Sequence, residues 1–127
     1  MIVLDASAAV LGLLNDGEAR AKLCEDRILC PHLVDSEVAH ALRAQVLRGS
    51  VDADDATRAI EAWRRLGIER VGVVGLLDRI WELRDNLSAY DATYVALAEA
   101  CEVPLLTADS RIARAPGARC TVVVVRR

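Results

Sequence analysis

Ile2-Val3-Leu4-Asp5-Ala6-Ser7-Ala8-Ala9 opens the chain with three apolar residues, one acid and a run of small residues. This pattern predicts a short buried strand that runs directly into a helix. The acid then lies at the carboxyl end of a strand. In open α/β sheets the ligand crevice lies just beyond those ends, so Asp5 becomes the first candidate site residue.

The rest of the chain repeats this alternation of strand and helix. Apolar runs predict further strands at residues 28–31, 70–74, 103–107 and 121–125. Helical spacing and capping predict one helix after residues 15–17, and others at residues 33–48, 52–66, 76–87 and 89–100. Such alternation favours a mostly parallel sheet covered on both faces, a three-layer α/β/α fold. With 127 residues and no internal repeat or linker, we expect one domain spanning residues 1–127.

The composition narrows the class of protein. Hydrophobic residues make up 54% of the chain, yet no apolar run reaches the roughly 18 residues of a membrane span, so we expect a soluble, cytoplasmic protein. The net charge of -3 argues against a simple nucleic-acid coat, although fifteen of the sixteen basic residues are arginine. The cysteines form no C-x-x-C pair and are expected to be buried free thiols, and His32 and His40 lack a third zinc ligand.

Four acids stand out by their position. Asp5 and Asp109 each follow an apolar strand, while Glu37 and Asp91 lie on or beside the apolar face of a predicted helix. For each acid alone a structural explanation stays open, either as a helix N-cap or as the partner of an arginine. A buried ionised carboxylate costs several kcal/mol unless it is paired, hydrogen-bonded or bound to a metal.

Together, the four acids predict a metal site. Two strand ends and two helix faces can converge on one crevice, and oxygen ligands without His or Cys suit Mg²⁺ or Mn²⁺. We expect no basic residue among the four. In that case the carboxylates repel one another when no metal is bound, and their pKa values rise.

The spaced set of motifs resembles a known family. Val3-Leu4-Asp5-Ala6-Ser7, Ser36-Glu37-Val38, Tyr90-Asp91-Ala92 and Leu106-Thr107-Ala108-Asp109 are similar to the PIN-domain pattern of VapC-type toxins, over essentially the whole chain. The resemblance implies a three-layer fold, usually dimeric, whose four acids bind Mg²⁺ or Mn²⁺ and hydrolyse RNA. It also implies that Ser7 and Thr107 line the pocket and that an antitoxin covers it. The helices that begin near Leu33 and Asp52 are candidates for the antitoxin groove.

Two other functions fit part of this pattern. An aspartyl phosphatase would use Asp5 as a nucleophile, but it requires a second Asp where this chain has Ser7, and a phosphate-binding lysine that Lys22 does not supply. A non-catalytic PIN-like or receiver-like interaction module would use the same acids only as caps and ion pairs. Stabilisation by Mg²⁺ separates this second alternative from an enzyme.

Overall fold

Five parallel strands form the centre of the molecule. A computed structural model describes residues 1–126, so the last residue of the predicted domain, 127, lies outside the described part. The strands are β1 (Ile2–Leu4), β2 (Ile28–Pro31), β3 (Glu69–Val71), β4 (Leu105–Thr107) and β5 (Val122–Val124), in the order β3-β2-β1-β4-β5. All four strand pairs are parallel, as the alternating pattern predicts.

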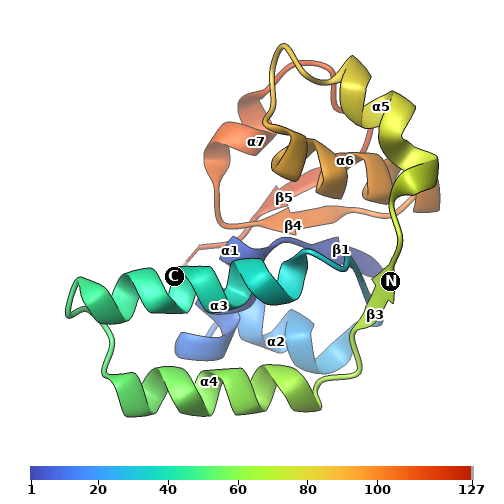
Figure 1. Cartoon of the computed structure of the whole chain (residues 1–127). Coiled ribbons are helices and arrows are strands. Elements are labelled where there is room, and N and C mark those ends of the chain that lie inside the picture. The colour runs from blue at the N-terminus through green and yellow to red at the C-terminus, as the bar shows by residue number, and fades with distance from the viewer. Residues whose placement is uncertain (127) are drawn as a thin grey trace.

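Helices cover both faces of this sheet. Figure 1 shows α5 (Leu77–Glu82), α6 (Ala89–Cys101) and α7 (Ser110–Arg114) on one side of the strands. On the other side lie α1 (Ala6–Leu14), α2 (Glu18–Glu25), α3 (Val34–Leu47) and α4 (Ala53–Arg65). The predicted three-layer α/β/α fold is confirmed.

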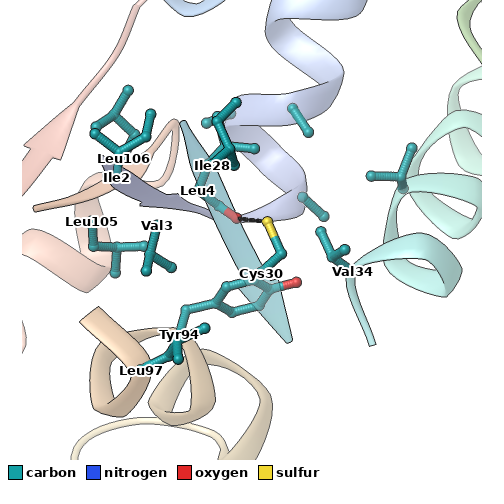
Figure 2. Close-up of a cluster of buried hydrophobic side chains, with 14 of the residues drawn as sticks. Ile2, Val3, Leu4, Ile28, Cys30, Val34, Tyr94, Leu97, Leu105 and Leu106 are labelled. Atoms are coloured by element: carbon teal, nitrogen blue, oxygen red, sulfur yellow. Dashed lines mark hydrogen bonds between the residues drawn. The ribbon is translucent and has the colours of Figure 1, made fainter. Parts of the chain in front are cut away.

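The core forms where β1 and α6 meet. All three residues of β1 are buried because a strand lies on either side of it and helices cover both faces. Figure 2 shows Tyr94 and Leu97 of α6 beside the apolar side chains of the sheet. It also shows the Cys30 thiol donating a hydrogen bond to the Leu4 carbonyl at 3.1 Å. Burial raises the pKa of Cys30 to about 12, so this thiol is an inert core residue.

The predicted strand at 70–74 is shorter than the sequence indicates. It ends at Val71, which pairs with Pro31, the last residue of β2. Beyond that point the edge strand has no neighbour, and residues Val74–Leu76 form a 3₁₀ turn, η1, in which Val74 is 82% exposed. An apolar run therefore does not extend the strand without a partner strand.

Three other expectations need correction. The helix predicted at residues 76–87 ends at Glu82, and residues 83–87 form turns that lead to Ser88, the N-cap of α6. The five-residue helix α7 was not predicted, because so short a segment shows no periodicity. All four cysteines are free, but Cys24 is exposed and only Cys30 is fully buried.

Within residues 1–126, no helix combines the length and the apolar character needed to cross a bilayer.

Candidate active site

The parallel register of β1 and β4 places Asp5 beside Thr107. Leu4 is paired with Leu106, so the next residue of each strand leaves the sheet at the same edge. Asp5 has extended backbone angles and is the N-cap of α1, where its Oδ1 accepts a hydrogen bond from the Ala8 amide at 3.0 Å. Asp5 therefore does serve as a helix cap, but this role takes up only one hydrogen bond to one of its two carboxylate oxygens.

Two hydroxyl groups hold the remaining parts of this carboxylate. Ser7 Oγ donates to Asp5 Oδ1 at 2.6 Å, and Thr107 Oγ1 donates to Asp5 Oδ2 at 2.5 Å. We call Ser7 and Thr107 the hydroxyl clamp. Ser7 Oγ in turn accepts a hydrogen bond from the Ala108 amide, and Thr107 Oγ1 accepts one from the Asp109 amide. These bonds fix the orientation of both hydroxyl groups. A carboxylate has about four acceptor positions, and this arrangement fills three of them.

Burial raises the pKa of Asp5, although the clamp and the Ala8 amide oppose the change. Only 5% of the residue is exposed, and the charge of Asp91 adds to the effect of burial. Within residues 1–126, no basic side chain lies within salt-bridge distance of Asp5. This part of the chain therefore supplies the Asp5 carboxylate with no positive counter-charge.

Glu37 enters the same site from the first turn of α3. Its Oε1 accepts a hydrogen bond of 2.5 Å from the Tyr94 hydroxyl, which α6 brings across from the other side of the sheet edge. Burial raises the pKa of Glu37, the hydrogen bond from Tyr94 lowers it, and the charges of Asp91 and Asp5 raise it again. One carboxylate oxygen is therefore held by Tyr94, while the other makes no hydrogen bond within the described residues.

Asp91 lies in the first turn of α6, three residues after the N-cap Ser88. Its side chain is half-buried, and burial together with the charge of Asp109 raises its pKa. No Arg or Lys of the described chain lies within 4.0 Å of it. We call Asp5, Glu37 and Asp91 the acidic trio, because all three have raised pKa values and none has a basic partner among the described residues.

Asp109 differs from the trio, and here the sequence prediction was wrong. We expected no basic residue among the four acids, but both Asp109 oxygens accept hydrogen bonds from the Arg111 guanidinium at 2.6 to 3.2 Å. This pairing lowers the pKa of Asp109 against the opposing effect of burial. Asp109 is also the N-cap of α7, since it accepts from the Arg111 amide at 2.9 Å.

All four acids line one pocket of about 240 Å³ at the carboxyl ends of β1 and β4. Ser7 also lines it, whereas Thr107 is completely buried and acts on the pocket through its hydrogen bonds to Asp5, Ser7 and the Asp109 amide. Two further polar residues of this pocket, Tyr94 and His40, were not predicted as site residues. Tyr94 could have been recognised as a phenol on an otherwise apolar helix face. His40 could have been recognised because it lies one helical turn from Glu37.

The donor set of this pocket fits a hard divalent cation. Three carboxylates without a basic partner need positive charge, and carboxylate oxygens are the ligands that Mg²⁺ and Mn²⁺ prefer. Within residues 1–126, no three His, Cys, Asp or Glu side chains converge closely enough to hold one ion by themselves. Mg²⁺ usually keeps several waters and is bound directly by one or two carboxylates, so the donor type rather than a closed cage of ligands carries the argument for such an ion.

Comparison with known proteins agrees with this architecture. The model of the PIN domain family matches residues 2–118. The chain is 54% identical to "VapC ribonuclease Mb0985" of Mycobacterium bovis over 127 residues, which covers all of both chains. Among solved structures, PAE2754 from Pyrobaculum aerophilum has a TM-score of 0.70 at 23% identity, over 95% of this chain and 81% of that one.

A second solved structure shares the fold across nearly the full length. It is VapBC2 from Rickettsia felis bound to a DNA fragment from its promoter, with a TM-score of 0.68 at 14% identity, and the match covers 98% of each chain. At such low identity the two structures support the fold alone. The family match and the full-length relative go further, and from them we conclude that the chain belongs to the PIN-domain family and, within it, to the VapC-type proteins.

Proposed function

We propose that this protein is an endoribonuclease dependent on Mg²⁺ or Mn²⁺ and that it acts as the toxin of a type II toxin-antitoxin pair. One observation carries the proposal: four acids from four separate segments line a single pocket, and three of them have no basic partner within residues 1–126. A full-length relative at 54% identity is named a VapC ribonuclease, which supports RNA as the substrate.

Each side chain has a distinct task in this proposal. Asp5 and Asp91 are the direct ligands, because the clamp leaves one acceptor position of Asp5 open and Asp91 makes no ion pair within residues 1–126. A divalent cation bound there offsets charge on the scissile phosphate and lowers the pKa of a coordinated water. Glu37 Oε2 is free to accept a proton from the attacking water, and its raised pKa brings it closer to neutral pH.

Asp109 has the weakest claim to a metal. Arg111 neutralises it, so a cation that binds Asp109 must displace the guanidinium or share the carboxylate with it. We therefore assign Asp109 to a second, weaker ion, and the main ion to Asp5 and Asp91, with Glu37 beside it. The Arg111 side chain is 79% exposed, which leaves it free to move.

A cleavage assay tests this function. Protein purified free of any antitoxin is incubated with total RNA in Mg²⁺, in Mn²⁺ and in excess chelator, and the new ends are mapped. We expect cleavage only with metal and 5′-phosphate ends, because water rather than the ribose 2′-hydroxyl is the nucleophile. Full activity in chelator, or 2′,3′-cyclic phosphate ends, would contradict the proposal. Absence of any metal-dependent stabilisation would instead favour an interaction module.

An antitoxin partner belongs to the same proposal. Helices α3 and α4 enclose an almost entirely apolar groove of about 300 Å³, lined by Leu42, Val46, Ala56 and Ile60 among others. An amphipathic antitoxin segment fits such a groove. The test is co-expression with the small protein encoded beside the gene. Wild type should co-purify with that protein and lose its toxicity, whereas Val46→Glu should stay toxic.

We also propose a homodimer in the cytoplasm. Three large apolar side chains are exposed near α5: Val74 at 82%, Leu77 at 53% and Trp81 at 68%. They follow one another at spacings of three and four residues, as on one face of a helix. The free cysteines suit a reducing compartment. Light scattering on wild type and on Trp81→Glu should give a dimer and a monomer, respectively, with one domain per chain.

A further inference from the structure

A second hollow continues from the acidic pocket along the surface. It has a volume of about 400 Å³ and lies between α1 and α3. Ser7 and Ala41 line both hollows, one residue from each helix, so the two hollows adjoin. An RNA strand whose phosphate lies at the acids would therefore meet this second hollow next.

The floor of the hollow follows one face of α3. Side chains at intervals of three or four residues lie on the same side of a helix. Such intervals separate Glu37, Ala41, Ala44 and Arg48, which follow one another by four, three and four residues. With a rise of 1.5 Å per residue, Arg48 is about 16 Å along the helix axis from Glu37. That separation corresponds to a few nucleotides of extended single strand.

The hollow has apolar walls and a polar far end. Leu11 and Leu14 of α1 face Ala44 of α3 across it, while Gln45 and Arg48 lie at the end distant from the acids. Apolar walls suit the flat face of a base, and an amide side chain suits its hydrogen-bonding edge. The combination differs from the groove between α3 and α4, which is almost entirely apolar.

Arg48 is exposed, and within residues 1–126 no carboxylate lies within 4.0 Å of it. Many other arginines of this acidic chain are committed to ion pairs, such as Arg58 with Asp55 and Arg70 with Asp35. An uncommitted guanidinium at the end of a hollow that starts at a nuclease site is matched in charge and shape to a phosphate.

We propose that the hollow between α1 and α3 binds the single-stranded RNA that flanks the scissile bond, with Arg48 on a phosphate and a base between Leu11, Leu14 and Ala44. The inference rests on the proposed ribonuclease function and adds the path of the substrate to it. Arg48 is a positioning residue for RNA, because it lies too far from the acids to touch the reacting atoms.

RNA binding by the full-length chain tests the path. All proteins carry Asp91→Asn so that the RNA stays intact, and the probe is a labelled mixed-sequence single strand of about twelve nucleotides. Binding is followed by fluorescence anisotropy over a range of salt concentrations. We expect Arg48→Ala to weaken binding about 5- to 10-fold and to reduce the slope of log affinity against log salt by about 0.7, the value for one lost phosphate contact on a single strand.

Two further variants sharpen the result. Arg65→Ala is the matched control: Arg65 is also an exposed arginine at the end of a helix, makes no ion pair in the described chain, and lies on α4 outside the hollow. It should bind RNA as the parent protein does. Ala44→Glu places a carboxylate inside the hollow while preserving helix propensity, and it should weaken binding at least as much as Arg48→Ala.

Each alternative outcome overturns the inference. Equal losses in Arg48→Ala and Arg65→Ala would mean that only overall charge matters. Normal RNA binding by Arg48→Ala, with loss of antitoxin co-purification, would assign the hollow to the antitoxin. If the parent protein binds RNA and neither Arg48→Ala nor Ala44→Glu weakens it, the path alone is wrong. If wild type cuts no RNA in Mg²⁺, the proposed function fails as well.

Discussion

Replacing Asp91 by asparagine separates the electrostatic and catalytic consequences of the acidic trio. The substitution keeps the shape of the side chain and leaves the hydrogen bond between the Asp91 amide and Ser88 in place. In the metal-free protein it removes a half-buried charge that Asp109 repels. Because the group is partly exposed, solvent screening limits this relief to about 1 kcal/mol.

A second effect opposes the first. Asp91 lies in the first turn of α6, where a carboxylate gains about 0.5 kcal/mol from the helix dipole. The net gain is therefore about 0.5 kcal/mol, or a rise in Tm of about 2 °C for a domain of this size. Asp54→Asn is the control, since Asp54 lies in the first turn of the equally long helix α4 and is exposed. It should lower the Tm slightly.

Thermal melts with chelator and with Mg²⁺, paired with RNA cleavage, check all parts of this prediction. Wild type should gain about 2.7 kcal/mol when Mg²⁺ exceeds its Kd a hundredfold, whereas Asp91→Asn should gain much less at the same concentration. Cleavage should slow at least ~100-fold, the equivalent of about 2.7 kcal/mol. If Asp91→Asn melts lower than wild type in chelator and retains both its Mg²⁺ response and its cleavage rate, Asp91 is a structural acid and the shared metal site is wrong.

Three further predictions follow from the same site. The raised pKa of Asp91 means that its protonated form is favoured in the fold, so the stability it contributes is fully present below its ordinary pKa of 3.8 and is lost as the pH rises through the raised value. In chelator, the Tm advantage of Asp91→Asn should therefore vanish at low pH and be complete near about pH 7. Tyr94→Phe removes the hydrogen bond to Glu37, so we expect the free energy of unfolding in urea to fall by about 1 to 2 kcal/mol. Because that hydrogen bond lowers the pKa of Glu37, its loss should shift the pH profile of cleavage to higher pH. An unchanged profile would mean that Glu37 takes no part in proton transfer. Arg111→Ala removes the ion pair of Asp109, so in an Mn²⁺ titration the variant should bind the ion more tightly than wild type does. The control variant Arg65→Ala should bind Mn²⁺ as wild type does.

The sequence was a good guide where a site residue followed an apolar strand or lay on a helix with clear periodicity. Asp5 and Asp109 follow strands, and parallel strands end at one edge of a sheet, so their meeting was predictable. Glu37 and Asp91 were recognisable because a carboxylate beside an apolar helix face needs compensation. Helix α4, with acids in its first turn and Arg64 and Arg65 in its last, was predicted nearly to its ends.

The interactions between elements were not predictable in the same way. The bond from Tyr94 to Glu37 joins residues 57 positions apart, and nothing in either segment indicates the other. Arg111 pairs with Asp109 only because the short helix α7 starts there, and five residues are too few to show helical periodicity. The end of β3 at Val71 depends on where the neighbouring strand stops, which is a property of the sheet rather than of the local sequence.

The hydroxyl clamp also sets when during synthesis the active site becomes complete. Thr107 and Asp5 are separated by 102 positions, so the first strand made waits for one of the last to reach it. At about 5 to 20 residues per second, that interval lasts roughly 5 to 20 seconds on the ribosome. On the proposed function, a chain that stops before β4 should be harmless, because it lacks both Thr107 and Asp109. The nascent protein passes most of its synthesis before the clamp can form, and a partner that covers the pocket, as proposed above, would have that time to be made.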